Sequence, residues 1–155
     1  MPIKKVRKFL DENGVKYVLI SHSPAYTAQE IATSSHIPGK DLAKTVMFRK
    51  DGKMTMAILP APYKIDFCKL KQKLSADNVE LASEDEFKYF FPDCAIGAMP
   101  PFGNLYDMEV YVDESLTKDN EIAFNAGTHT ELIKLDYSDF SRLVKPIVLN
   151  FKLFY

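Results

Sequence analysis

The segment that most constrains the fold of this chain is residues 97–104, Gly-Ala-Met-Pro-Pro-Phe-Gly-Asn, which holds two glycines, two prolines and no charged side chain. Proline fixes φ and lacks an amide donor, whereas glycine permits positive φ and close approach of another molecule. We therefore expect a stiff loop that presents main-chain groups. Such a loop either connects a helix ending near Pro92 to a strand beginning near Glu109 or forms part of a functional site.

Helical and strand patterns alternate along the rest of the chain. Asp51-Gly52 predicts a two-residue hairpin turn, and the segments 27–30 and 83–86 match the capping box that opens a helix. Gly14 follows an amphipathic segment where a helix commonly ends. The expected helices cover about 3–13, 28–35, 66–74, 83–92 and 138–143, and the expected strands cover about 15–21, 44–49, 54–60, 79–81, 108–113, 122–126 and 131–135. The mixture of hairpins and short helices predicts an α+β fold.

Length and composition predict one globular domain over residues 1–155, since 155 residues with 46% hydrophobic content can bury a sizeable core. The apolar tail after Pro146 is either a last strand or a linker. No apolar run has the length of a membrane span or the form of a signal peptide, so we expect a cytoplasmic protein that does not bind membranes. Cys68 and Cys94 lack CxxC spacing, which predicts reduced thiols.

Charge is distributed unevenly along the chain. Residues 40–73 carry nine Lys or Arg against three Asp or Glu, whereas residues 74–122 carry two against twelve. The basic segment either faces phosphates or forms solvated helix faces. The lysines considered as phosphate-facing are Lys64, Lys69, Lys71 and Lys73.

Familiar catalytic motifs are absent from the sequence, which contains no GxSxG elbow, Walker loop, GxGxxG or HExxH. The three histidines His22, His36 and His129 are too scattered to predict a metal site, so no metal or cofactor is expected. Cys94 is interpreted as a buried structural thiol rather than a nucleophile, because no histidine stands near it in sequence. His22 is interpreted as a satisfied strand-end histidine.

Three segments in order resemble the YbaK and prolyl-tRNA-synthetase-associated domain family. They are Leu42-Ala43-Lys44-Thr45-Val46, the loop from Gly97 to Gly103, and Ala126-Gly127-Thr128-His129, and residues 23–30 are similar to the first helix entry of that family. The resemblance extends from about His22 to Arg142. It implies a mixed, barrel-like sheet surrounded by short helices, and a trans-acting enzyme that hydrolyses the ester of a mischarged aminoacyl-tRNA, often a tRNA for proline.

The resemblance also implies the residues of the site. Those assigned to catalysis are Lys44, Gly97, Gly103 and His129, and those assigned to substrate binding are Tyr26, Thr27, Thr45, Pro100, Pro101, Phe102, Gly127 and Thr128. Lys44 would hold a phosphate or the ester oxygens, and main-chain amides near the two loop glycines would face the carbonyl or the amino group. His129 would fix the amino group or a water.

Two other function classes remain open at this point. A module of this fold could bind aminoacyl-tRNA, or an aminoacyl-tRNA synthetase, without cleaving it. A hydrolase of a different small ester would use the same residues but would not need the basic segment. The retained Lys44 and loop glycines favour the deacylase.

Overall fold

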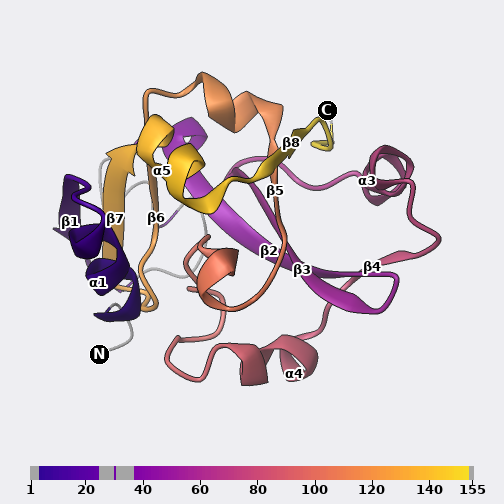
Figure 1. Ribbon diagram of the computed structural model, residues 1–155, viewed down its shortest axis with the longest axis horizontal. Coiled ribbons are helices and arrows are strands. Elements are labelled where there is room, and N and C mark those ends of the chain that lie inside the picture. The colour runs from indigo at the N-terminus through magenta and orange to yellow at the C-terminus, as the bar shows by residue number, and fades with distance from the viewer. Residues whose placement is uncertain (1–3, 25–29, 31–36, 154–155) are drawn as a thin grey trace.

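A computed structural model describes residues 4–24, 30 and 37–153. The strands of this part of the chain form one mixed sheet in the order β1-β7-β6-β2-β3-β5-β8, with β4 paired to β2 (Figure 1). The strands are β1 (Tyr17–Ser21), β2 (Leu42–Lys50), β3 (Lys53–Pro60), β4 (Val79–Leu81), β5 (Val110–Asp113), β6 (Glu121–Asn125), β7 (Glu131–Asp136) and β8 (Ile147–Leu149). The predicted α+β class with a mixed sheet is confirmed.

Helices border this sheet on both faces. They are α1 (Lys4–Glu12), α3 (Phe67–Leu74), α4 (Glu84–Phe87) and α5 (Tyr137–Val144), with 3-10 turns η1 (Gly39–Asp41), η2 (Lys88–Phe90), η3 (Gly103–Leu105) and η4 (Glu114–Lys118). Buried residues of α1 and α5 belong to one hydrophobic cluster, whereas α3 packs into another together with Phe48 and Phe151. The expected helix over 28–35 lies, apart from Glu30, outside the described residues.

Local chemistry sets the ends of several elements. Asp51 and Gly52 have φ of +51° and +84°, as a tight hairpin between β2 and β3 requires. The Asp66 side chain accepts the amide of Lys69 and starts α3. The capping box predicted at Ser83 is present, but α4 ends at Phe87 and a 3-10 turn follows, so the helix is shorter than expected.

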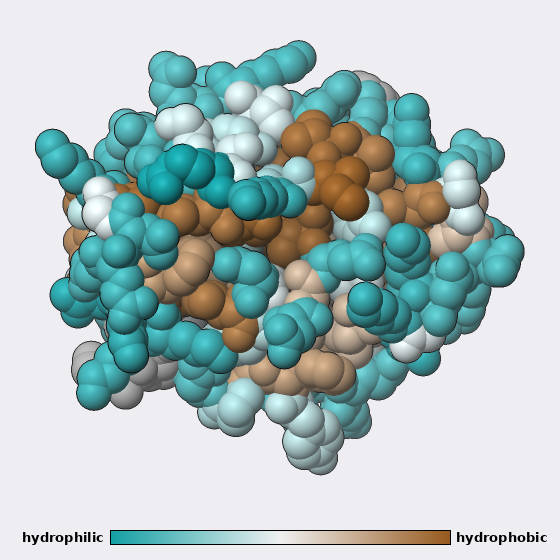
Figure 2. All heavy atoms as spheres, in the orientation of Figure 1, coloured by the Kyte–Doolittle hydropathy of each residue, from teal (hydrophilic) through white to brown (hydrophobic). Residues whose placement is uncertain are grey.

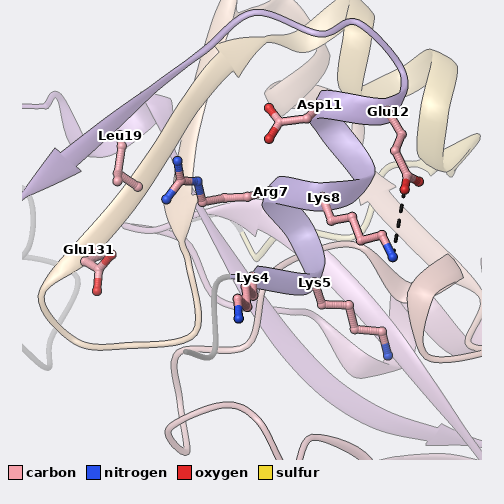
Figure 3. Close-up of a pocket in the computed structure, with 8 residues that line it drawn as sticks. All are labelled: Lys4, Lys5, Arg7, Lys8, Asp11, Glu12, Leu19 and Glu131. Atoms are coloured by element: carbon pink, nitrogen blue, oxygen red, sulfur yellow. Dashed lines mark ion pairs between the residues drawn. The ribbon is translucent and has the colours of Figure 1, made fainter.

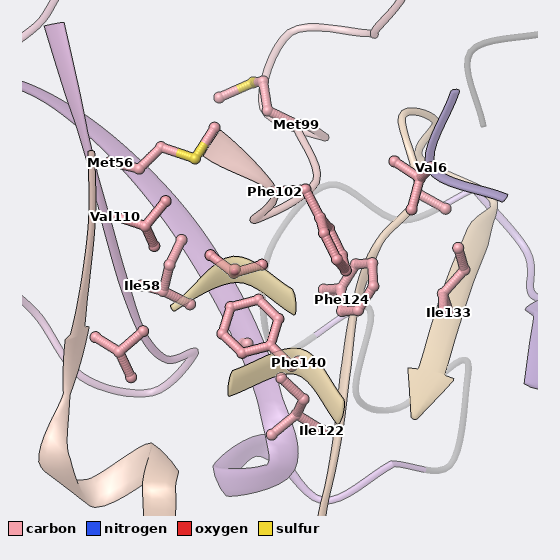
Figure 4. Packing of buried hydrophobic residues seen from close by; sticks show 14 of the residues in the cluster. Val6, Met56, Ile58, Met99, Phe102, Val110, Ile122, Phe124, Ile133 and Phe140 are labelled. Atoms are coloured by element: carbon pink, nitrogen blue, oxygen red, sulfur yellow. The ribbon is translucent and has the colours of Figure 1, made fainter. Parts of the chain in front are cut away.

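The loop from Gly97 runs into the main hydrophobic core. Phe102 is fully buried and meets three rings at angles between 61° and 82°, those of Phe9, Phe124 and Phe140, with centroids 5.3–6.1 Å apart (Figure 4). Edge-to-face contacts of this kind add specific stabilisation to the burial of apolar area. The second half of the loop is therefore anchored between α1, β6 and α5.

The apolar tail is a last strand, because β8 pairs in parallel with β5. The carboxylate of buried Asp113 accepts the amides of Phe151 and Lys152 at 2.9 and 3.0 Å, which fixes the chain beyond β8. Ile147 and Val148 remain 50% and 44% exposed, and an apolar patch lies over this strand (Figure 2).

Candidate functional site

The loop at Gly97 and the turn at Gly127, about 30 residues apart in sequence, are bonded to each other in the structure. The Ala95 amide donates to the Gly127 carbonyl at 2.8 Å, and the Gly127 amide donates to the Ala98 carbonyl at 2.9 Å. The side chain of His129 extends this contact, since its Nε2 lies 2.9 Å from the Ile96 carbonyl oxygen. Two segments singled out in the sequence thus form one unit.

Both glycines of this unit adopt a conformation that suits glycine. Gly97 has φ of +86° and Gly127 has φ of +94°. A Cβ at Gly97 would lie 3.5 Å from Cε1 of His129, which is an ordinary contact, so the backbone angle rather than crowding selects glycine there. The Gly97 amide donates to the Met99 sulfur at 3.2 Å. Sulfur is a weak acceptor, so a substrate oxygen could replace it.

Lys44 stands on the strand beside this unit. The parallel pairing of β2 with β6 joins Leu42 to Ala123 and Ala43 to Phe124. Extending that register by one residue places Lys44 beside Asn125, which is two residues before Gly127. The sheet therefore carries the predicted lysine to the strand end at which the glycine turn begins.

The surroundings of Lys44 disfavour the protonated, charged form of its side chain. Burial lowers its pKa, and repulsion from Lys64 lowers it further. Among the described residues Lys44 forms no ion pair with a carboxylate. A half-buried cation without a counter-ion is a good receptor for an anionic oxygen, because binding would supply the missing charge.

The remaining predicted loop residues lie deeper in the molecule. Pro100, Pro101 and Phe102 are buried, and a Cβ at Gly103 would lie only 2.5 Å from Val110 Cγ2. This placement indicates that these buried residues hold the Gly97 segment in position against the core. Direct contact of these residues with a substrate stays a prediction.

Other predicted residues are dispersed. Thr128 is half-buried in the glycine turn, and Thr45 is half-buried on β2, where strand alternation turns it to the face opposite Lys44. Tyr26 and Thr27 lie outside the described residues. Of the four predicted tRNA-facing lysines, Lys64 is close enough to Lys44 to affect its pKa.

The other three of these lysines belong to α3. Lys69 donates to the Asn150 side chain at 2.8 Å, while Lys71 and Lys73 are exposed. In Figure 1, α3 lies at the far right, whereas β6, β7 and α1 lie at the left. The α3 lysines are therefore well separated from the glycine turn.

Cys94 does not have the properties of a nucleophile. Burial raises the pKa of its thiol to about 11, so the thiolate form is scarce at neutral pH. The thiol contacts the Tyr106 hydroxyl at 3.6 Å. In the described part of the chain, no three His, Cys, Asp or Glu side chains gather in a way that could hold a metal ion.

Asn125 is absent from the residues predicted from sequence. It stands at the end of β6, where the run Ile122–Phe124 is otherwise fully buried and apolar. A polar residue at a strand end, two residues before a Gly-Thr-His turn, is the signal that could have identified it.

A separate cleft of about 700 Å³ lies between α1 and the strands β1 and β7 (Figure 3). None of the residues predicted for the site lines it. The cleft carries charges of both signs, because its lining includes four cations from α1 and three carboxylates. The lining residues are Lys4, Lys5, Arg7, Lys8, Asp11, Glu12, Leu19 and Glu131. Lys8 pairs with Glu12 at 3.9 Å.

Residues 22–143, which include all of the unit described above, match the family described as the aminoacyl-tRNA editing domain. The chain belongs to this family. The family and the class of activity expected from the resemblance are thereby confirmed: the protein is an editing domain, of the deacylase class.

Individual relatives agree with this assignment. The editing domain is 29% identical over 150 residues to the prolyl-tRNA editing protein ProX of Acetoanaerobium sticklandii, covering 92% of this chain and 90% of that protein. It is 35% identical over 105 residues to the proline–tRNA ligase of Staphylococcus saprophyticus, covering 66% of this chain but only 18% of the ligase.

A solved structure provisionally named as a trans-editing enzyme for prolyl tRNA synthetase has the same fold as this editing domain. The TM-score is 0.84 at 20% sequence identity, with 99% of this chain and 98% of that chain covered. No helix in the described part of the editing domain is long and apolar enough to cross a membrane.

Proposed function

We propose that this protein acts in trans, in the cytoplasm, on tRNA for proline that carries a wrong amino acid, and that it hydrolyses the ester between them. The match to ProX extends over 90% of that protein, whereas the match to proline–tRNA ligase covers 18% of the ligase. This difference in coverage favours a separate editing protein over a ligase as the closer analogue.

The observation that carries the proposal is the joined Gly97 and Gly127 unit with Lys44 on the adjoining strand. An aminoacyl ester is already activated, so the enzyme needs to supply orientation, a positioned water and stabilisation of the oxyanion. In our proposal the Lys44 ammonium and the Gly97 amide face the developing negative charge. A protein nucleophile is not required.

His129 supports the same chemistry by its position. Its ring bonds to the Ile96 carbonyl and lies against Gly97, so it fixes the backbone from which the Gly97 amide projects. In our proposal it also orients the water or the amino group of the substrate. A neutral imidazole can accept the proton that the attacking water releases.

The alternative function is a module that binds aminoacyl-tRNA, or a synthetase, without cleaving it. A panel of tRNAs for proline charged with alanine, serine, cysteine or proline separates the two. Release of one noncognate amino acid, with prolyl-tRNA spared, is the expected result. Unchanged esters in every case, with the tRNA still bound, would leave only the binding module.

A further inference from the structure

A row of polar side chains at the site comes from β2, from β6 and from the residues next to the ends of β7 and β1. The small cluster of Leu42, Ala123, Leu132 and Ile20 occupies one face of β2, β6, β7 and β1. Side chains two residues apart on a strand share a face. The next positions on that face, all at the same end of the sheet, are Lys44, Asn125, Thr130 and His22.

Backbone pairing shows that this row is staggered by two residues at β7, because Leu132, the partner of Asn125, pairs with Ile20 and not with His22. Asn125 pairs with Leu132 in the register of β6 and β7, and the His22 amide donates to the Thr130 carbonyl at 2.9 Å. His22 and Asn125 therefore lie on either side of the same strand, β7. Strands separated by one intervening strand are roughly 10 Å apart, and the offset of two residues along β7 brings the backbone separation of His22 and Asn125 to roughly 12 Å.

Two members of the row have a buried polar atom without a hydrogen-bond partner among the described residues. These atoms are Nε2 of His22 and Oδ1 of Asn125. The expectation that His22 is satisfied thus holds for one ring nitrogen only. Buried polar atoms are nearly always bonded in folded proteins, and leaving one unbonded is unfavourable.

Both of these atoms are hydrogen-bond acceptors. Nδ1 of His22 lies 2.7 Å from the Ser23 carbonyl oxygen, which can only accept, so Nδ1 carries the proton. In the neutral ring Nε2 then presents a lone pair, as does the amide oxygen of Asn125. The row therefore offers two acceptors on the same face of the sheet as the cation of Lys44, with Asn125 beside it.

We propose that His22 and Asn125 bind the hydrogen-bond donors at the aminoacyl end of the substrate, namely the α-ammonium group and the ribose hydroxyl. The backbone spacing of about 12 Å leaves room between the two side chains for an amino acid together with the ribose to which it is esterified. Lys44 binds the negatively charged oxygens of the substrate, while His22 and Asn125 accept hydrogen bonds from its donors. This inference rests on the proposed function and names the recognition residues of that same site.

The test uses a ligand that cannot be hydrolysed, 3′-alanylamino-3′-deoxyadenosine, and its N-acetyl derivative. Calorimetry compares the wild type with His22→Phe and Asn125→Leu, and thermal unfolding is followed for each protein. We expect each variant to bind the amine about 10-fold more weakly, and we expect the variant that lacks the acceptor for the α-ammonium group to lose most of the preference over the N-acetyl compound. The Tm should be unchanged or raised, because an unbonded buried acceptor has been removed.

The control is Asn120→Leu, the same substitution just before the opposite end of β6, which should bind as the wild type does. Asn125→Asp keeps an acceptor and should restore binding of the amine. Affinity within twofold of the wild type in both variants, or a loss of affinity accompanied by a lower Tm, would overturn the proposal. Because binding is measured without hydrolysis, a protein that binds the amine but cleaves no ester would refute the proposed function alone.

Discussion

Lys44 shows how a half-buried charge lowers the stability of a fold. Its pKa is lowered by burial and by Lys64, so between that lowered value and the ordinary pKa the folded state binds fewer protons than the unfolded state. The free energy of unfolding therefore rises as the pH rises through that window. At neutral pH the charged form is disfavoured in the fold.

Replacing this lysine with methionine is expected to stabilise the protein at pH 7 and to flatten the rise in stability at alkaline pH. Each kcal/mol gained should appear as roughly 2–4 °C in Tm. The measurement is thermal unfolding between pH 7 and 10, with Lys71→Met, an exposed lysine of α3, as the control. A lower Tm for Lys44→Met than for the control would contradict the conclusion that the charge of Lys44 destabilises the folded state.

Gly97 holds its loop in a left-handed conformation that alanine adopts at a cost of about 1–2 kcal/mol. Gly97→Ala should therefore lose about that much stability and also displace the amide that we propose to face the substrate, reducing hydrolysis by tenfold or more. Gly52→Ala is the matched control, because Gly52 has nearly the same φ, +84°, and nothing within 4 Å of its Cβ position. Equal activity losses in the two variants would argue against a role for the Gly97 amide.

Gly103 illustrates a different use of glycine. A Cβ there would lie 2.5 Å from Val110 Cγ2 and 2.8 Å from the Met108 carbonyl oxygen. Gly103→Ala is expected to lower the free energy of unfolding by about 1–3 kcal/mol through overpacking. Urea unfolding measures the change, and a variant as stable as the wild type would show that η3 can move away from β5.

At the scale of elements, the end of the chain depends on one buried acid. Both oxygens of Asp113 are used, since one accepts the amides of Phe151 and Lys152 and the other accepts the amide and hydroxyl of Ser115. This arrangement joins β5, η4 and the segment after β8.

Asp113→Ala leaves several amide donors unpaired and should cost about 2–4 kcal/mol in the free energy of unfolding. The exposed acid Asp85 provides the control, with an expected change below about 0.5 kcal/mol for Asp85→Ala. Urea denaturation of both variants makes the comparison. A small effect at Asp113 would mean that the tail packs without this acid.

Elements whose limits depend on neighbouring residues could be predicted from sequence. The Asp51-Gly52 turn, the Ser83 capping box and the α1 terminus before Gly14 are all present, because each depends on backbone angles or short-range hydrogen bonds. Placement of Phe102 could not be predicted. An aromatic residue in a loop looks the same whether it faces a ligand or enters the core.

At the scale of the whole molecule, the site depends on pairings between distant segments. The parallel register of β2 with β6 aligns Lys44 with Asn125, and loop-to-loop hydrogen bonds join Gly97 to the turn at Gly127. These contacts follow from packing of the complete sheet, which no local pattern specifies. For that reason the role predicted for Lys44 follows from the resemblance, whereas the roles proposed for Asn125 and His22 follow from the structure.

The most direct test of the proposed mechanism is single-turnover hydrolysis of the noncognate aminoacyl-tRNA that the panel identifies, by the wild type and by Lys44→Met at saturating protein. Loss of oxyanion stabilisation should slow release of the amino acid by about 100-fold or more, with tRNA binding changed far less. A Lys44→Met protein that releases the amino acid at the wild-type rate would contradict the central role of this lysine.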